Sequence, residues 1–512
     1  MNRAVRFLLA ALSGALFAFA FPNVAIGALA FVALLPLLLA LGRTSGGREA
    51  FLLGWLSQMI AWLLMVPWVI RVMSHYGGLP LPVGIAIFCA MALYLGMYGG
   101  LFAWLVWRIA PGASVRRWLL VPLAWAAVEY VRTYLFTGFP WNLIAAAIVD
   151  LTSFVQFDRV AGPYLLGAMI VVPSAIAAWW ILNPATGIKR LFVASGTIIF
   201  LFVWWASGLV AAKLFTRPSG QPMATAALLQ PNISQQMRWS NENVITIYQR
   251  MVGMTVDAFG HGVKVVIWPE STVPLSFAAT DFFRDSVEEL SREHDADIML
   301  GSVAEDQAQP NRLWNAAFLV SSGRIIGHYD KIKLVPFGEY VPMRTMLFFA
   351  EKLVHDVGEF EFGTRDTPLD GRFRYGPAIC YEVVYPQIGR QQVVHGANVL
   401  VTITNDAWYD GTSAPRQHLN QARLRAVETD RFLLRAGTTG ISALVDPAGQ
   451  IRKQIPMGQQ GIIYAEFEPR HSKTGYVRFG DWFAWLACAG VAFAALRLRP
   501  RASFLPRKGS KT

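Results

Sequence analysis

The sequence predicts a membrane protein with two parts, a multi-span α-helical membrane domain of about eight helices and an α/β domain outside the cytoplasm. Three observations predict it. Only 15% of the 512 residues are charged, whereas about 25% is typical of soluble domains. Long apolar runs fill residues 1–213, and short strand-like and helix-like segments alternate over residues 214–478. Lys and Arg gather in alternate short loops between the apolar runs.

The composition also excludes other classes of protein. With 54% hydrophobic residues the chain is not intrinsically disordered, and with three cysteines it is not a compact disulfide scaffold. The net charge of +12 first raises nucleic acid as a partner. However, residues 1–213 and the tail from Arg497 carry all of that excess, and the segment between them is slightly acidic. The basicity is therefore chiefly an orientation signal, and no nucleic-acid partner is expected.

Residues 1–213 are predicted to form seven transmembrane helices, because most apolar runs reach the ~17–25 residues that cross the hydrocarbon core. The first run is short and resembles a signal peptide, although the runs that follow favour a retained span. An eighth helix, within residues 479–497, is borderline in length, and a basic tail of residues 498–512 follows it. The predicted spans are Phe7–Phe21, Val24–Leu41, Phe51–Ile70, Val83–Trp107, Trp118–Phe136, Val160–Leu182, Leu191–Ala212 and Asp481–Leu496.

The positive charges predict how the chain crosses the membrane. If the spans alternate, most Lys and Arg of the short loops fall on one side, which is the cytoplasmic side in membrane proteins. Both termini are therefore expected in the cytoplasm, and residues 214–478 on the opposite side. The residues on the basic side are Arg3, Arg6, Arg43, Arg48, Arg108, Arg116, Arg117, Lys189, Arg190 and those of the tail from Arg497.

Residues 214–478 have shorter apolar runs that turn residues interrupt, as is typical of an α/β domain. Ser322-Gly323 and Pro447–Gly449 indicate hairpins. Helices are expected at Asn243–Phe259, Thr280–His294 and Arg416–Leu434. Strands are expected at Ala224–Leu229, Val263–Trp268, Asp297–Ser302, Ala316–Val320, Tyr375–Cys380, Asn398–Thr404 and Ile441–Asp446.

Cys380 is the only cysteine of this second part, since Cys89 and Cys488 lie in apolar spans, where they are interpreted as small core residues. An unpaired thiol outside the cytoplasm is a liability unless it has a function. Cys380 ends a predicted strand, where it can be presented as a nucleophile near a helix N-terminus. A cysteine simply buried in a strand explains the same pattern, and on these grounds alone both interpretations stand.

Two other strand ends carry charged residues. Glu270 comes just after the strand Val263–Trp268 and a proline. Lys331, Lys333 and Glu339 follow the Ser322-Gly323 hairpin. Considered singly, each of these residues is more simply interpreted as a charged side chain exposed to solvent. A Glu, a Lys and a Cys in this order, each after a strand, form a much narrower pattern, and it favours nucleophilic catalysis by a thiol with a carboxylate base.

The motifs around these residues resemble those of the nitrilase superfamily and, within it, of the bacterial apolipoprotein N-acyltransferase family. The resemblance covers nearly the whole chain. It rests on Trp268-Pro-Glu270, Leu334-Val-Pro-Phe-Gly-Glu-Tyr-Val-Pro342, Cys380-Tyr-Glu382, Glu129-Tyr-Val-Arg132 with Gly138-Phe-Pro-Trp141, and Pro231-Asn-Ile-Ser-Gln with Trp239 following.

This resemblance implies a nitrilase-like αββα sandwich, with Glu270 as the general base, Lys331 as the cation and Cys380 as the nucleophile. Lys331 matches rather than Lys333 because it lies eight residues before the glutamate of the Pro-Phe-Gly-Glu motif. The further supporting or substrate-binding residues that the resemblance implies are Glu339, Tyr381, Glu382, Trp239 and Val335. Glu339 and Glu382 are expected to keep Lys331 charged and in place.

The resemblance also implies a function. A fatty acyl chain would pass from a phospholipid, such as phosphatidylethanolamine, through a thioester on Cys380 to the N-terminal α-amine of S-diacylglyceryl-cysteine of a diacylated lipoprotein. The site would lie on the periplasmic side of the bacterial inner membrane, in contact with membrane lipid. No cofactor is expected, and no metal, since His418 has no second ligand at a metal-like spacing.

Two alternatives remain open beside this function. A membrane-tethered nitrilase-type amidase would pass the acyl group to water, but hydrolysis of a soluble amide gives no reason for eight spans. A transporter that uses the second domain as a binding module would need more polar residues in its spans than this chain has.

Two other features have competing interpretations. Phe337–Leu353 is unusually apolar, so that it is either an arm that dips into the membrane interface or a helix packed on the domain. Glu129 and Arg132 lie at positions i and i+3 of the fifth span and can pair. A structural bridge to the Gly138–Trp141 loop is the favoured role for them.

Overall fold

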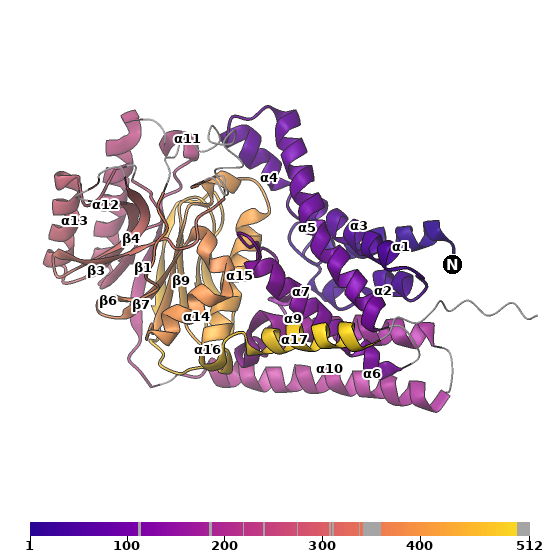
Figure 1. The fold of residues 1–512 in the computed structure, drawn as a ribbon. Helices are drawn as coiled ribbons and strands as arrows, with labels where there is room; N and C mark the ends of the chain where they lie inside the picture. Colours follow the sequence, from indigo (N-terminus) through magenta and orange to yellow (C-terminus); the bar gives the residue numbers. More distant parts are fainter. Residues whose placement is uncertain are drawn as a thin grey trace, which may run out of the picture. The chain divides into compact units, whose positions relative to one another are not determined.

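The computed structural model describes residues 1–110, 114–183, 187–218, 220–238, 241–273, 275–306, 309, 312–336, 338–340 and 360–498 (Figure 1). The chain forms two compact units. The first contains residues 1–157, 161–209 and 481–512, and the second contains residues 158–160 and 210–480. Trp239 and most of the apolar segment 337–353 lie outside the described residues.

The first unit is helical. Its helix α3 (Gly47–Met65) packs against α1 (Arg3–Phe19) and α5 (Leu81–Ile109). Small residues allow the close approach of α3 and α5, because a Cβ added at Gly54 would lie 2.1 Å from the carbonyl oxygen of Gly99. The other long or apolar helices are α2 (Leu35–Leu41), α7 (Leu120–Tyr134), most of α9 (Asp158–Leu182), most of α10 (Gly187–Phe215) and α17 (Trp482–Arg497).

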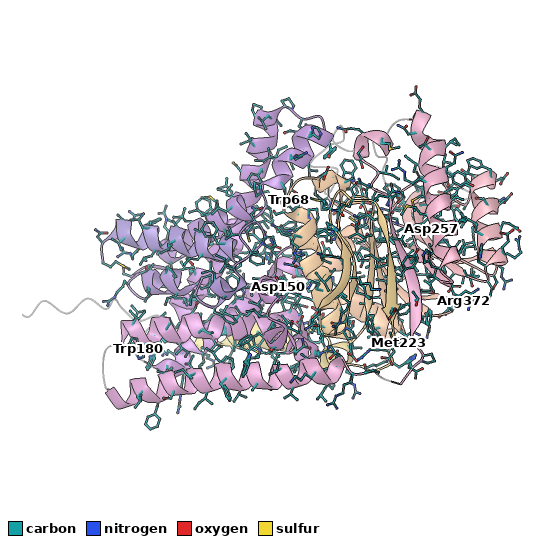
Figure 2. The ribbon with its side chains drawn as sticks, turned by 180° about the vertical axis from the view of Figure 1, so that it is seen from behind. Trp68, Asp150, Trp180, Met223, Asp257 and Arg372 are labelled. Atoms are coloured by element: carbon teal, nitrogen blue, oxygen red, sulfur yellow. The ribbon has the colours of Figure 1, made fainter. Side chains whose placement is uncertain are left out.

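Within the described part of the chain, three helices are long and apolar enough to cross a membrane, namely α5, α9 and the Leu191–Phe215 part of α10. A fourth candidate joins α3 to the segment Trp68–Tyr76, with a bend of 55°. Their outward side chains are apolar, as with Trp180 on α9, which is 42% exposed (Figure 2). The length and apolar surface of these helices identify the chain as a membrane protein, as predicted.

The number of full-length helices is smaller than the eight spans predicted, because several apolar runs fold as shorter pieces. The second predicted span divides into the 3₁₀ helix η1 (Gly27–Phe31) and α2. The fifth divides into the single turn α6 (Val115–Trp118) and α7. At a rise of ~1.5 Å per residue, the 15 residues of α7 cover only about 22 Å. The apolar run in the sequence predicts the helical region but not its breaks.

Glu129 and Arg132 on α7 hold the loop that follows this helix. The Arg132 guanidinium donates to the carbonyl oxygens of Phe139, at 2.9 Å, and of Trp141, at 2.8 Å. Glu129 Oε1 accepts the backbone N–H of Ile144 at 2.8 Å and lies 3.8 Å from Arg132. Two buried charges thus satisfy backbone groups of the loop, which is the structural bridge expected from the sequence.

The second unit contains two six-stranded sheets. In each sheet three central strands are parallel and the outer strands are antiparallel. The first sheet has the order β12 (Gly461–Phe467), β1 (Ala224–Gln230), β2 (Val265–Ile267), β3 (Asp297–Glu305), β4 (Leu313–Ser321) and β5 (Arg324–Asp330). The second has the order β11 (Ile451–Ile455), β10 (Ser442–Val445), β9 (Leu433–Gly437), β8 (Val399–Thr404), β7 (Arg374–Ile379) and β6 (Leu369–Asp370).

Helices cover the outer face of each sheet (Figure 1). On the first sheet these are α12 (Val244–Gly260) and α13 (Asp281–Glu293), and on the second α14 (Pro386–Val394) and α15 (Ala414–Thr429). One apolar core lies between the first sheet and its helices, and another lies between the two sheets. The predicted αββα sandwich is therefore confirmed.

Each predicted strand and helix of this unit is present, with most boundaries within three residues of the prediction and one that differs by more. The helix predicted to reach Leu434 ends at Thr429, since Asp430 adopts a left-handed conformation with φ 55° and β9 starts at Leu433. The strands that the sequence analysis missed are β5, β6, β9, β11 and β12, and the α-helices that it missed are α11 (Gln235–Arg238), α14 and α16 (Gly475–Phe479).

Three residues that precede the long part of α9, Asp158–Val160, belong to the second unit. Non-helical backbone at Ala161 and Gly162 separates them from the rest of α9. Arg159 Nη1 lies 2.9 Å from Asp430 Oδ1, and its guanidinium also donates to the carbonyl oxygen of Pro447. A tripeptide from the middle of the helical half is thus built into the α/β half.

Candidate active site

The charged residues and the thiol singled out in the sequence meet at one edge of the sandwich. Glu270 follows β2, Lys331 directly follows β5, and Cys380 directly follows β7. The carboxyl ends of parallel strands open at the same edge of a sheet, which is where α/β proteins place their sites. Gly301 on β3 makes room for this arrangement, since a Cβ there would lie 2.7 Å from the Cα of Glu270.

Cys380 has an unusual backbone conformation. Its φ is +49°, in the left-handed region that residues other than glycine rarely adopt. It begins the 3₁₀ turn Cys380–Val384, so that the strand turns sharply at the thiol. A non-glycine residue in this region costs about 1–3 kcal/mol and persists only where the surroundings hold it. Such strain is common at catalytic nucleophiles that a sharp strand-to-helix turn presents.

Lys331 is the centre of a buried charge cluster. Its Nζ lies 3.2 Å from Glu270 Oε1 and 2.9 Å from Glu339 Oε1. Asn315 Nδ2 donates to the same two oxygens, each at 2.8 Å. The second oxygen of Glu270 accepts the backbone N–H of Asn405 at 2.9 Å. The lysine side chain is only 1% exposed, so that it is held between two carboxylates away from water.

These contacts decide the protonation of the cluster. Burial opposes the charge on Glu270, but the charge of Lys331 and hydrogen bonds from Asn315, Lys331 and Asn405 outweigh it and hold the pKa below its usual value. Burial likewise opposes the charge on Lys331, but Glu270 and Glu339 raise its pKa. Both groups are therefore charged at neutral pH, Glu270 as a carboxylate and Lys331 as an ammonium group.

The thiol of Cys380 stays protonated in the same surroundings. Burial raises its pKa, and the nearby charge of Glu270 raises it further, whereas Lys331 acts in the opposite direction. A thiol in this state is a poor nucleophile until a base takes its proton. An ionised carboxylate beside a neutral thiol is the arrangement in which the proton moves during attack rather than before it.

Glu382 contacts the backbone rather than Lys331. Its Oε1 accepts the N–H groups of Ile332, at 2.6 Å, and Lys333, at 3.0 Å, and its Oε2 accepts that of Ile379 at 2.8 Å. The Tyr329 hydroxyl donates to both oxygens. Burial raises the pKa of Glu382 to about 7, against these hydrogen bonds and the charge of Lys331. Glu382 therefore ties the segment after Lys331 to the strand that ends at Cys380.

The remaining predicted residues lie nearby or outside the described chain. The backbone N–H of Val335 donates to Glu339 Oε2 at 2.8 Å, which fixes the second counter-ion of the lysine. Tyr381 is 5% exposed, and its ring lies 5.3 Å from that of Tyr385 in an edge-on contact. Trp239 lies outside the described residues.

Several residues of the site were not predicted. Asn315 and Asn405 both donate to Glu270, and Asp406, His418 and Arg435 form a cluster behind Cys380. Asn315 is a buried amide within an otherwise apolar strand, and this contrast could have singled it out in the sequence. Asn405 follows β8 as Glu270 follows β2, but it acts through its backbone, for which no side-chain pattern exists. Within the described residues, no group of three or more His, Cys, Asp or Glu side chains is arranged to hold a metal ion.

Comparisons with known proteins cover both parts of the chain. Residues 13–176 match the family described as apolipoprotein N-acyltransferase N-terminal domain, and residues 225–473 match the family described as carbon-nitrogen hydrolase. The apolipoprotein N-acyltransferase of Geobacter metallireducens is 34% identical over 96% of this chain and 94% of its own length. That of Methylococcus capsulatus is 32% identical over 96% of each chain. The crystal structure of an amidase from Nesterenkonia sp. aligns with 50% of this chain and 94% of its own, at 19% identity and a TM-score of 0.38.

Proposed function

The chain belongs to the apolipoprotein N-acyltransferase family, and from this premise we propose that it transfers a fatty acyl chain from a phospholipid to the N-terminal α-amine of an S-diacylglyceryl-cysteine. The acyl chain is carried as a thioester on Cys380. The observation that supports this most directly is a protonated thiol at a strained strand end, coupled electrostatically to a buried, ionised Glu270.

In the first half-reaction Cys380 Sγ attacks the ester carbonyl carbon of the phospholipid, and the thiol proton moves to Glu270. The carbonyl oxygen becomes an oxyanion, which Lys331 Nζ and a backbone N–H beside Cys380 stabilise. One such donor changes the rate by ~10²–10³-fold. The ester C–O bond then breaks, the oxygen of the lysophospholipid takes the proton from Glu270, and the acyl thioester remains.

In the second half-reaction the neutral α-amine of the acceptor attacks the thioester carbon. Glu270, again ionised, takes the proton that the nitrogen loses as the C–N bond forms. The C–S bond breaks, and the proton on Glu270 passes to the Cys380 sulfur, which restores the thiol and the carboxylate. The order of events is ping-pong, because the lysophospholipid leaves before the amine reacts. A site shielded from water favours the amine over hydrolysis, and Cys380 is only 6% exposed.

Membrane helices suit this reaction, because the acyl donor and the diacylated acceptor both reside in a bilayer. The Lys and Arg bias of the short loops supports an orientation with both termini in the cytoplasm and the α/β unit on the periplasmic side of the inner membrane. Phosphatidylethanolamine is the donor proposed.

The function can be tested by trapping the intermediate. Full-length protein incubated with acyl-labelled phosphatidylethanolamine is expected to acquire label that hydroxylamine releases, and a synthetic diacylated lipopeptide is expected to discharge it as triacylated product. A Cys89→Ser/Cys488→Ser variant retains Cys380 as its only cysteine and is expected to label equally. No label on the wild-type protein would refute the covalent route. Faster loss of label to water than to lipopeptide would make the protein a hydrolase rather than a transferase, as the amidase alternative requires.

The rate of adduct formation is expected to be flat between about pH 8 and 9.5, above the range in which Glu382, with a pKa of about 7, changes its charge. Glu270 must be ionised to take the proton, and its lowered pKa keeps it so throughout this range. Cys380 has a raised pKa and stays protonated throughout, so that no thiolate population grows with pH. The initial labelling rate measured across this range checks the prediction. A rise with a midpoint near 8.5, the usual pKa of a thiol, would show that a free thiolate is the attacking species.

A further inference from the structure

A buried polar cluster lies behind Cys380 and contains Asp406, His418 and Arg435. Asp406 starts the 3₁₀ turn that follows β8, His418 lies on α15 and Arg435 lies on β9, so that three elements in or beside the second sheet each contribute one side chain. Their side chains are at most 1% exposed. The thioester chemistry proposed above uses none of the three directly. Burying three polar side chains in one place costs free energy, so that their presence needs an explanation.

The cluster reaches the nucleophile through one hydrogen bond. His418 Nε2 lies 2.9 Å from the carbonyl oxygen of Cys380. On the other side of the ring, Nδ1 lies 3.0 Å from Arg435 Nη2 and 3.1 Å from Asp406 Oδ1. The same Arg435 nitrogen donates to Asp406 Oδ2 at 2.8 Å. A carbonyl oxygen can only accept, so Nε2 carries a hydrogen and donates it.

Arg435 favours this tautomer by donating to Nδ1, whereas the Asp406 carboxylate, 3.1 Å from Nδ1, acts in the opposite direction. Burial and the charge of Arg435 lower the pKa of His418 and outweigh Asp406 and the Cys380 carbonyl, which raise it, so that the ring is neutral at neutral pH and carries a single proton. Burial opposes the charge on Asp406, but Arg435 outweighs it and holds the pKa of that carboxyl below its usual range. Arg435 is thus fixed by Asp406 and donates to Nδ1. The one proton of the imidazole is left on Nε2, facing Cys380.

The carbonyl of Cys380 and the N–H of Tyr381 belong to one planar trans peptide, and they point in opposite directions. Fixing the carbonyl on one side therefore aims the N–H on the other. We propose that His418 is a positioning residue, which holds this peptide so that the Tyr381 N–H faces the oxyanion formed during attack by Cys380. The proposal rests on the thioester chemistry proposed above, because only acyl transfer creates that oxyanion.

Two matched amide variants separate this role from simple packing. In His418→Gln the side-chain nitrogen reaches the place of Nε2 and can still donate to the Cys380 carbonyl. In His418→Asn the amide ends near the place of Nδ1, so that it can bind Asp406 and Arg435 but does not reach Cys380. Both variants keep a polar group against the two charges, and their thermal unfolding is measured beside that of the wild type.

The readout is the steady-state transfer of label from phosphatidylethanolamine to the lipopeptide. His418→Asn is expected to lower kcat by about 10²-fold, the usual effect of one oxyanion donor, with KM for the phospholipid changed less than about threefold. His418→Gln is expected to restore kcat to within about tenfold of the wild type. A merely structural residue would give variants that lose activity in step with their thermal stability, and it would not distinguish Gln from Asn.

The two proposals fail in different ways. If the wild-type protein forms no adduct, the proposed function fails and this inference falls with it. If the wild type forms the adduct and His418→Asn is as fast as His418→Gln, or if the loss lies in KM, only the role of His418 is overturned. Should His418→Asn not fold, His418→Met replaces it, since Met retains the volume and lacks the donor. The kcat of His418→Met must then be at least about tenfold below that of His418→Gln.

Discussion

Replacing Cys380 with Ser is expected to abolish both the hydroxylamine-sensitive adduct and the acylation of the lipopeptide, with a loss of at least about 10³-fold. The reason lies in the match between base and nucleophile. The pKa of Glu270 is held below its usual value by Lys331 and three hydrogen bonds, so that this carboxylate is a weak base. It can accept a proton from a thiol during attack, but a hydroxyl group is far less acidic and gives its proton up much less readily.

The measurement compares Cys380→Ser and Cys380→Ala with Cys488→Ser, which removes a partly buried thiol on α17 outside the site. The control should label at the wild-type rate. Label that persists on Cys380→Ala and remains sensitive to hydroxylamine would place the thioester on another cysteine and end the assignment. Equal unfolding temperatures of Ser and wild-type proteins would exclude loss of fold as the cause.

The second large effect is expected for Glu270→Gln, which should slow adduct formation by about 10³-fold. The amide has nearly the size of the carboxylate and can still accept bonds from Asn315 and Lys331. It cannot take a proton, however. Its NH₂ group would also face the backbone N–H of Asn405, so that two hydrogen-bond donors would oppose each other. Lys331 retains Glu339 at 2.9 Å, so that the lysine is not left without a counter-ion.

The pH dependence of the residual activity makes this prediction specific. Without a base, only the small thiolate fraction of Cys380 reacts, and the labelling rate should rise about tenfold per pH unit where the wild type is flat. Glu466→Gln, an exposed change on β12, serves as the matched control. A Glu270→Gln protein that labels at the wild-type rate, or that shows the flat wild-type profile, would remove Glu270 from the role of base.

How far the fold follows from the sequence depends on burial. Strands β1, β2, β3, β7 and β8 are largely buried and form apolar runs in the sequence, so that their positions could be predicted. In contrast, β11 exposes its three middle residues and is dominated by charge and amide, so it has no such signal. The pair Leu433 and Leu434 continued the apolar spacing of α15, and only the left-handed Asp430 shows where that helix stops.

Whether a site residue could be predicted depends on whether it acts through its side chain or contacts the backbone. Glu270, Lys331 and Cys380 could be singled out in the sequence because each follows a strand and carries a charged or reactive side chain, although the choice of Lys331 over Lys333 came from the family resemblance. Glu382 was expected to add charge beside Lys331, yet its oxygens bind backbone N–H groups of Ile332, Lys333 and Ile379. Every residue except proline supplies a backbone donor, so a sequence cannot show which of them a carboxylate will meet. His418 was considered only as a metal ligand for the same reason, since the group that it contacts in Cys380 is a backbone carbonyl.

The tripeptide Asp158–Val160 has a consequence for how the protein is made. It leaves the ribosome before β1 and before the rest of the α/β unit, yet Arg159 pairs with Asp430 near the far end of that unit. The catalytic half therefore completes its folding around a piece of chain already synthesised within the helical half. A gene fragment encoding only residues 210–480 would omit that piece and leave Asp430 without the guanidinium of Arg159. The α/β unit is therefore not one contiguous block of the chain, because it includes residues 158–160 from within the segment that matches the N-terminal family.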